Sequence, residues 1–474
     1  MPQIPADNAI LAAWRETLAR RGEAAAVLGP DGTTLRTFTG IECEAEALRP
    51  EYQSFPAGAV IAVQIGNSPA WPAVLLALFR AGLIPLPVGR HVETGELELA
   101  LATCHAAAII RADGERLLVE RRDAEPIQWG GPAPEFLKLT SGTTSAPRAI
   151  RFRAAQLVAD AASICATMGI TEADVNFGAI PFSHSYGFSN LLTPLLCRGV
   201  TLVATEDRLP RAILHDLARS GATVFPGMPV FFQKLAELEN GGELPQLRLC
   251  ISAGAPLPGE VARRFAGRYG QKIHTFYGAS ECGGIAYDAS EAVEHEEGFV
   301  GTAMAGVSIR PATGDEPAQI CVQSAAVGDG YFPQTDSETL GIHGFTPSDL
   351  VRATPAGLVI VGRSSDVINI AGRKLNPLEV EQRLLGCAGV RQAVVFGVPS
   401  ALRGEEPVAC VAAVPGTDAA TVMRFCQAEL SQWQRPRDIW LLPEIPVNER
   451  GKISRRALAE RYLAERSGGV KRPV

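Results

Sequence analysis

The segment from Leu139 to Ile150 gathers side chains that can hold an anion. Its residues read LTSGTTSAPRAI, so five hydroxyl side chains and one glycine precede a proline and the cation Arg148. The residues before it, 135–139, have the pattern of a short strand. A turn rich in Thr, Ser and Gly after a strand directs backbone N–H groups and hydroxyls toward one point, which suits phosphate oxygens. The pattern therefore predicts a site for a nucleotide triphosphate.

Local composition alone leaves one alternative open, an ordinary surface loop rich in Ser and Thr. The segment is also not a Walker A loop, because that motif requires G-x-x-x-x-G-K-[ST] and the segment does not supply it. A P-loop kinase or GTPase is therefore disfavoured.

Length and composition restrict the class of protein. The chain has 474 residues, 46% hydrophobic and 20% charged, enough for roughly two to four domains with buried cores. Its net charge of −7 argues against a dedicated nucleic-acid binder, which usually has a basic face.

Ten cysteines without a C-x-x-C spacing predict reduced, mostly buried thiols. The first residues lack the features of a signal peptide, and Pro and Gly interrupt the longest uncharged run. We expect a cytoplasmic protein without a membrane span. The sequence makes no prediction of its oligomeric state.

Strand and helix patterns alternate along most of the chain, which predicts an α/β architecture with largely parallel sheets. The predicted strands are 59–65, 83–88, 135–139, 149–153, 200–203, 222–225, 247–252 and 272–276, and the predicted helices are 71–81, 154–168, 210–219 and 258–269. After about residue 295, short strands punctuated by glycine, at 300–307, 318–322 and 358–361, predict a smaller β-rich subdomain. From Gly362–Asp366 onward the pattern is α+β. We therefore expect a large domain at 1–364 and a small one at 365–474.

Further segments follow the opening loop in a fixed order. They are Pro181–Phe188 (PFSHSYGF), Phe276–Glu281 (FYGASE), Gly362–Asp366 (GRSSD) with Ala371–Glu381 (AGRKLNPLEVE), and Arg450–Arg455 (RGKISR). In this order and approximate spacing the chain resembles the adenylate-forming superfamily, which includes acyl-CoA synthetases, luciferases and the adenylation domains of peptide synthetases. The resemblance runs from about residue 57 to about residue 458 and is weak between 89 and 134.

The resemblance implies a large N-terminal adenylation core of parallel βαβ-type subdomains plus a β-rich subdomain, followed by a mobile α+β C-terminal domain. It also implies a reaction in two steps. A carboxylate oxygen attacks the α-phosphorus of ATP, which gives an acyl-adenylate and releases pyrophosphate, and a thiol or amine then attacks the activated carbonyl. Because the first step joins two anions, its catalysis must consist mostly of positioning and charge neutralisation. ATP, Mg²⁺ and CoA are the implied cofactors.

The family roles fall on particular residues of this chain. The resemblance implies that Thr140, Ser141, Gly142, Thr143, Thr144 and Arg148 cradle the β- and γ-phosphates, that Glu281 holds Mg²⁺, and that Tyr277, Gly278 and Ser280 line the adenine and α-phosphate site. It implies that Asp349 accepts hydrogen bonds from the ribose hydroxyls, that Arg363 reaches the ribose or phosphate, and that Lys452 bridges the substrate carboxylate and the α-phosphate. His184 would stand between the acyl pocket and the thiol tunnel, Ser365 would be the hinge of domain rotation, and Gly372 would let a pantetheine arm pass.

Departures from the family pattern raise two alternatives. Ser145, Arg148 and Ala149 stand where the family has Gly, Lys and Gly, so the chain could be a non-catalytic relative that holds ATP without turnover. The intact Lys452 argues against that reading. A serine hydrolase is the second alternative, because Gly278–Cys282 nearly matches G-x-S-x-G. The cysteine at the place of the second glycine disfavours it.

The residue pattern also restricts the substrate. The segment Ser183–Ser185 offers no carboxylate for an α-amino group, so an α-amino acid is disfavoured. Small residues at 253–255 and Gly278, beside Tyr186 and Phe188, suggest an apolar pocket for an aryl or fatty acid. No carrier-protein segment follows Lys452, so we expect CoA as the acceptor, with a separate acyl carrier protein as the alternative.

Overall fold

The computed structural model describes residues 8–129, 132–140, 147–239, 242–244, 246–312, 317–333, 338–400, 402–447 and 453–467. The chain divides into two compact units. The first consists of Met1–Ala312, Cys321–Pro347 and Ala353–Val359, and the second of Thr313–Ile320, Ser348–Arg352 and Ile360–Val474. Three strands, β17 (Ala318–Gln323), β21 (Asp349–Thr354) and β22 (Gly357–Arg363), contribute residues to both units. The boundary at 364/365 therefore stays a prediction.

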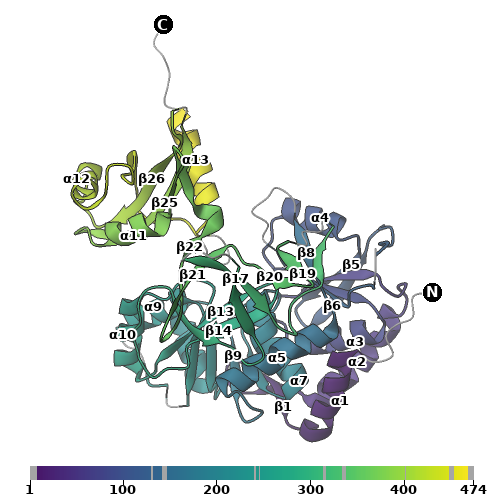
Figure 1. The fold of residues 1–474 in the computed structure, drawn as a ribbon. Coiled ribbons are helices and arrows are strands. Elements are labelled where there is room, and N and C mark those ends of the chain that lie inside the picture. Colours follow the sequence, from purple (N-terminus) through teal and green to yellow (C-terminus); the bar gives the residue numbers. More distant parts are fainter. Residues whose placement is uncertain are drawn as a thin grey trace. The chain divides into compact units, whose positions relative to one another are not determined.

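The first unit is built around a parallel sheet, as the alternating pattern predicts (Figure 1). Its strands follow the order β2-β1-β10-β9-β11-β12-β13-β14-β15. Pairing is parallel from β1 through β13 and antiparallel at both ends. The bounds are β1 (Ala25–Leu28), β2 (Thr34–Thr37), β9 (Val175–Gly178), β10 (Thr201–Ala204), β11 (Val224–Gly227), β12 (Leu249–Ser252), β13 (Ile273–Ala279), β14 (Gly283–Tyr287) and β15 (Phe299–Ala303). Central strands such as β11 and β12 are buried throughout, which explains their continuous apolar sequence.

A second sheet of the first unit has the order β4-β3-β5-β6. Its strands are β3 (Val60–Gln64), β4 (Ile84–Pro87), β5 (Ala106–Asp113) and β6 (Arg116–Arg121). The first two run parallel and are connected through α3 (Trp71–Arg80), so the strand–helix–strand prediction for 59–88 is confirmed. The helix is buried on nearly every side, which agrees with its apolar sequence.

The predicted phosphate loop is carried by a β-hairpin. Strand β7 (Phe136–Thr140) pairs antiparallel with β8 (Arg148–Phe152), with Thr140 opposite Arg148, and β18 (Gly330–Phe332) pairs with the outer edge of β8. Residues 141–146 lie outside the described residues. The described pairing places Thr140 and Arg148 directly opposite each other.

Helices cover the sheets of the first unit. They are α1 (Ala9–Arg21), α2 (Phe38–Tyr52), α4 (Thr94–Thr103), α5 (Ala154–Met168), α6 (Ser185–Gly187), the π-helical η1 (Phe188–Leu192), α7 (Thr193–Arg198), α8 (Pro210–Arg219), α9 (Pro229–Glu237) and α10 (Gly259–Tyr269). Short strands β16 (Ser308–Pro311), β19 (Leu340–Gly341) and β20 (Gly344–Phe345) belong to the β-rich part expected after residue 295. The helices predicted at 154–168 and 210–219 have the observed bounds.

The second unit has its own sheet and core. Strands β24 (Arg373–Leu375), β23 (Ile368–Ile370), β26 (Gly404–Ala413) and β25 (Val390–Ser400) lie in that order, and β27 (Asp438–Leu442) pairs parallel with β26. The 3₁₀ helix η2 (Ser364–Asp366) precedes the sheet, and the helices are α11 (Pro377–Leu385), α12 (Ala419–Glu429) and α13 (Arg455–Ser467).

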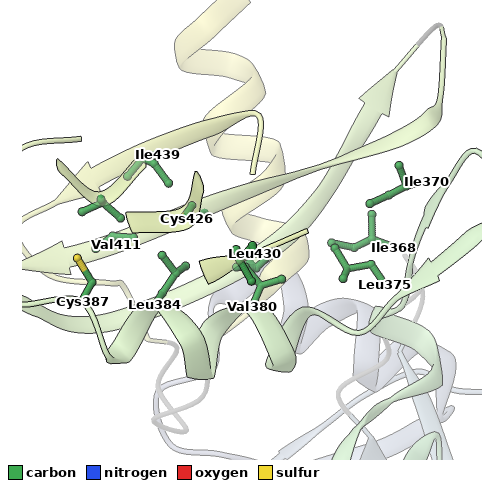
Figure 2. Packing of buried hydrophobic residues seen from close by; sticks show 13 residues of the cluster. Ile368, Ile370, Leu375, Val380, Leu384, Cys387, Val411, Cys426, Leu430 and Ile439 are labelled. Carbon is green, nitrogen blue, oxygen red and sulfur yellow. The ribbon is translucent and has the colours of Figure 1, made fainter. Parts of the chain in front are cut away.

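Residues of the long hairpin β25–β26 alternate between the two faces of that sheet. Val395, Ala409 and Val411 pack with the apolar sides of α11 and α12, and Figure 2 shows Val380 and Leu384 of α11 within this cluster. Val394, Phe396 and their neighbours on the other face pack against α13. The unit therefore has two hydrophobic layers of its own.

Two predictions from composition can be checked here. Within the described ranges, no helix combines the length and the apolar character that a membrane crossing needs. None of the cysteines forms a disulfide, and most of them are buried. The expectation of mostly buried thiols is confirmed.

Candidate functional site

Glu281 lies in the turn between β13 and β14 of the first unit. Asp160, a buried residue of α5, accepts a hydrogen bond from the backbone N–H of Gly284 at 3.0 Å. Gly283 has a φ of +70°, and a Cβ there would come within 2.1 Å of the Asp160 carboxylate. The positive φ and the lack of space for a Cβ together permit only glycine at position 283. The turn that presents Glu281 is therefore fixed to α5 by this close approach.

The Glu281 carboxylate joins the phosphate hairpin through Tyr331. The Tyr331 hydroxyl donates a hydrogen bond of 3.0 Å to Oε1 of Glu281. The Arg148 guanidinium lies over the Tyr331 ring, 4.1 Å from its centroid. Burial raises the pKa of the Glu281 carboxyl, and the Tyr331 hydrogen bond and the Arg148 charge act in the opposite direction. Three elements, β8, β18 and the β13–β14 turn, thus bring these side chains together at the base of the predicted phosphate loop.

The position of Glu281 suits a magnesium ion that the protein and the substrate phosphates bind jointly. Among the described residues, no group of three or more His, Cys, Asp and Glu side chains could hold a metal by itself. Mg²⁺ is usually bound by one or two carboxylates, water and substrate phosphates rather than by a complete protein cage. The single half-buried carboxylate of Glu281, beside the predicted phosphate loop, fits that pattern.

The segment around His184 meets the end of β13 through a pair of hydroxyls. Ser185 Oγ and Ser280 Oγ are 2.8 Å apart, so two of the predicted motifs are in contact. The His184 ring accepts a hydrogen bond from the backbone N–H of Tyr186 at 3.3 Å and so caps the short α6. Tyr277 and Gly278 lie on β13 just before this contact.

These contacts also bear on the hydrolase alternative. A nucleophilic serine needs a base within hydrogen-bond reach, and the described partner of Ser280 is the hydroxyl of Ser185. Cys282 is fully buried, and burial raises the pKa of its thiol well above the ordinary value. The prediction that Cys282 is a packed thiol is therefore confirmed, and the geometry gives a serine hydrolase no support.

Tyr186 borders the predicted acyl pocket. Its ring lies 5.8 Å from that of Phe276, and its hydroxyl donates to the backbone carbonyl of Ile251 at 3.1 Å. The ring packs in the same cluster as Ala253, just after the end of β12. Phe188 was expected beside the same pocket, but its ring packs 4.5 Å from Phe136 and belongs to the core. Residues two positions apart on a helix are about 200° apart around its axis, so Tyr186 and Phe188 face different sides.

Asp349 and Arg363 come together in the second unit. Asp349 is the first residue of β21 and Arg363 the last of β22, and Nε of the arginine is 2.9 Å from Oδ1 of the aspartate. The carboxylate is buried and the guanidinium is half exposed. The two predicted ribose-side residues thus form one ion pair.

Gly372 lies in the exposed turn between β23 and β24. Ala371 and Gly372 both have positive φ, at 51° and 85°, and the Asn369 side chain accepts a hydrogen bond from the Gly372 N–H at 3.0 Å. A Cβ on Gly372 would meet nothing within 4 Å, so its space is open.

Lys452 lies outside the described residues, as do Ser141, Gly142, Thr143 and Thr144. The first residue of α13, Arg455, is described. It pairs with Glu381 of α11 at 2.9 Å and with Asp366 of η2 at 2.7 Å, and donates to the Val395 carbonyl. Helix α13, which begins three residues after Lys452, is thus held to α11 and to η2.

Sequence reasoning gave no role to three described residues, Lys138, Arg455 and Tyr331. Lys138 is buried in β7, and its signal was a cation inside an apolar strand pattern. Arg455 entered only as the last residue of the Arg450–Arg455 motif, with no role of its own. Nothing in the local pattern around Tyr331 indicates its contact with Glu281.

The comparisons with known proteins agree with this picture. A family model described as AMP-binding enzyme matches residues 18–332, and one described as AMP-binding enzyme C-terminal domain matches residues 379–452. The chain is 25% identical to a feruloyl-CoA synthase from Amycolatopsis, over 84% of this chain and 87% of that protein. It is 25% identical to a sulfoacetate–CoA ligase from Cupriavidus necator, over 90% and 93%. An oxalate–CoA ligase from Arabidopsis thaliana is 28% identical, over 68% and 66%.

Solved structures share the fold. ATP-bound MatB from Rhodopseudomonas palustris superposes with a TM-score of 0.84 at 23% identity, over 96% of this chain and 98% of that one. The o-succinylbenzoate CoA synthetase MenE from Bacillus subtilis, bound to its acyl-adenylate intermediate, gives a TM-score of 0.80 at 21% identity, over 94% and 97%. The expected arrangement, a large α/β part followed by a small C-terminal domain, is confirmed.

Proposed function

The chain belongs to the AMP-binding enzyme family and is an AMP-forming acid–CoA ligase, and we propose that the residues described above divide its two half-reactions between them. In the first, a carboxylic acid and ATP give an acyl-adenylate and pyrophosphate. In the second, the thiol of CoA attacks the acyl carbonyl, a C–S bond forms, the C–O bond to AMP breaks and AMP leaves.

One observation supports the assignment of the adenylation site above the others. The hydrogen bond from Tyr331 to Glu281, with Arg148 over the Tyr331 ring, gathers a carboxylate and a cation at the base of the Thr140–Thr144 loop. In the proposed reaction this loop and Arg148 bind the β- and γ-phosphates. Glu281 supplies an oxygen ligand for Mg²⁺, which neutralises phosphate charge when bound.

The second unit supplies the remaining groups of the first step. The buried carboxylate of Asp349 accepts hydrogen bonds from the ribose hydroxyls, and Arg363 holds that carboxylate in place. Lys452 offsets the charge that builds up as the carboxylate oxygen approaches the α-phosphorus. The exposed turn at Gly372 is where the pantetheine arm of CoA passes in the second step. A separate acyl carrier protein remains the alternative acceptor.

We propose an aryl or other compact acid as the substrate. Tyr186 is half-buried and held at both ends, by Phe276 on its ring and by the Ile251 carbonyl on its hydroxyl, so it forms a rigid aromatic wall. A wall of this kind suits a flat acid better than a long chain that must pass it. The names of the three relatives above refer to feruloyl, sulfoacetate and oxalate groups.

A panel of carboxylic acids tests this function. The purified protein with ATP, Mg²⁺ and CoA is expected to release pyrophosphate only when its acid is present, and mass spectrometry should detect the matching acyl-CoA. Aryl acids should give higher rates than fatty acids with ten or more carbons. If no acid stimulates pyrophosphate release while ATP still binds, the chain is a non-catalytic relative.

Lys452→Ala separates the two half-reactions. Acid-dependent pyrophosphate release should fall about 10²- to 10³-fold, because a charge-stabilising group of the transition state is lost. Thiolation of a chemically prepared acyl-adenylate should stay within about threefold of the unchanged protein.

Arg456→Ala is the matched control, since Arg456 is an exposed cation of the same segment that pairs with Glu460. It should leave both steps intact. Equal loss of both steps in Lys452→Ala would contradict the proposed role of Lys452.

A further inference from the structure

Asn67 lies in the turn between β3 and α3 of the first unit, and its side chain is only 5% exposed. Gly66 before it has a φ of +62°, a conformation that favours glycine over residues with a side chain. The indole N–H of Trp71, the first residue of α3, donates to the Gly66 carbonyl at 2.6 Å. These constraints fix the turn that presents Asn67.

The Asn67 amide makes hydrogen bonds with both its nitrogen and its oxygen. Nδ2 donates toward three backbone carbonyls, that of Gly178 at 2.8 Å, that of Ile180 at 3.1 Å and that of Thr205 at 3.0 Å. Oδ1 accepts from the backbone N–H of Phe182 at 2.9 Å. A primary amide carries two N–H donors and one carbonyl acceptor, so neither a carboxylate nor an apolar side chain can replace all of these bonds.

These bonds join two sheets at the ends of their strands. Asn67 follows β3 of the second sheet, while Gly178 is the last residue of β9 and Thr205 directly follows β10 of the parallel sheet. Ligands of open α/β sheets bind outside the carboxyl ends of the strands. Asn67 therefore lies at the side of the sheets where a substrate is expected.

The same bonds hold the start of the segment that leads to the proposed acyl pocket. Ile180 and Phe182 come just before His184, whose backbone N–H donates to the Pro181 carbonyl at 3.0 Å. Helix α6 follows and carries Tyr186, whose ring forms the aromatic wall. The four bonds of the Asn67 side chain end on this segment and on the backbone next to β9 and β10, and none of the four ends on the β7–β8 hairpin.

We propose that Asn67 is a positioning residue for the carboxylic acid, because its amide holds residues 180–182 so that Tyr186 stands in place as the wall of the acyl pocket. The proposal rests on the proposed function, since it requires the acid to lie against Tyr186. The alternative is that Asn67 only stabilises the fold. Its loss would then lower the melting temperature and leave the acid KM of the folded enzyme unchanged.

Steady-state release of pyrophosphate at saturating ATP and Mg²⁺ separates these roles, with the most active aryl acid of the panel as the probe. In Asn67→Ala the acid KM should rise about tenfold, while the Kd for ATP, measured by calorimetry without acid, should change by no more than about threefold. The preference for the aryl acid over decanoate should fall as well. Unchanged acid KM in a folded Asn67→Ala protein would overturn the proposal, and so would equal losses toward the acid and toward ATP.

Asn8→Ala is the matched control. Asn8 is also a buried asparagine of the first unit, and its side chain accepts from the N–H groups of Ile10 and Leu11 and donates to Glu135. This variant removes a helix cap, so it should lower the melting temperature and leave the acid KM within about twofold. A rise in the acid KM equal to that of Asn67→Ala would overturn the proposal, because the loss of any buried amide would then explain both.

A milder variant tests the proposal if Asn67→Ala does not fold. Asn67→Ser supplies a hydroxyl and leaves room for a water that the freed carbonyls can bind, but it removes the direct bond to the Phe182 N–H. The acid KM should rise about threefold, and an unchanged acid KM would overturn the proposal. If the unchanged protein releases no pyrophosphate with any acid, the proposed function fails, and this inference fails with it. If it does release pyrophosphate, the contrary results above overturn this inference alone.

Discussion

At the scale of single residues, Glu281 combines burial with contacts that favour its charged form. Burial raises the pKa of its carboxyl, while Tyr331 and Arg148 favour the carboxylate that a hard cation requires. Glu281→Gln keeps the size of the side chain and removes its charge. We expect kcat/KM for ATP to fall about hundredfold, which corresponds to about 2.7 kcal/mol. The Mg²⁺ concentration that gives half-maximal pyrophosphate release should rise by about the same factor.

Tyr331→Phe is the matched control for that measurement. It removes the hydrogen bond of 3.0 Å and leaves the carboxylate in place, so the loss should stay below about tenfold. A Mg²⁺ dependence that does not change in Glu281→Gln would exclude Glu281 as a metal ligand.

At the scale of elements, Arg455 joins α13 to α11 and to η2. Glu381 is buried beneath it and also accepts a hydrogen bond from the Val395 N–H at 2.6 Å. Burial raises the pKa of Glu381 and Arg455 counteracts that rise, so in Arg455→Met the pKa should rise further. A carboxyl whose pKa is higher in the folded state binds more protons there, so its contribution to stability falls as pH rises. As pH rises above the ordinary pKa of a glutamate carboxyl, the melting temperature of Arg455→Met should therefore fall more steeply than that of the unchanged protein.

The double variant Arg455→Met with Glu381→Gln tests whether the Glu381 carboxyl, left without Arg455, causes this pH dependence. It removes the unpaired charge, whose burial costs about 3–5 kcal/mol, and should recover most of the stability and a flat pH profile. If Arg455→Met has the pH profile of the unchanged protein, the ion pair does not stabilise the second unit.

The elements and the site were predictable to different degrees. Apolar runs and helical periodicity predicted α5 and α8 with their observed bounds, because those signals are local. The antiparallel hairpin at the phosphate loop was not predicted, since the direction of pairing is not contained in a strand's own pattern. The motif order assigned Glu281 and Arg148 to one site, but Tyr331, which contacts both side chains, is 50 residues further along the chain than Glu281. Contacts of that separation depend on how the sheets pack.

At the scale of the whole molecule, the proposed site residues are divided between the two compact units. Glu281 and the phosphate hairpin belong to the first, while Asp349 with Arg363 belongs to the second. Lys452 belongs to the second unit as well. Neither unit alone carries all of the proposed residues, so a protein that lacks either one should release no pyrophosphate.

The second unit nevertheless has the components of an independent domain. Its sheet is covered on one face by the cluster that includes Val380, Leu384 and Val411 (Figure 2), and on the other by contacts with α13. A fragment that spans residues 365–474 should therefore fold by itself, with a single cooperative thermal transition in circular dichroism. Val395→Asp places an unpaired charge in the first of these layers and should abolish that transition. A fragment without cooperative unfolding would show that residues before 365 complete its core, and the predicted boundary at 364/365 would then be wrong.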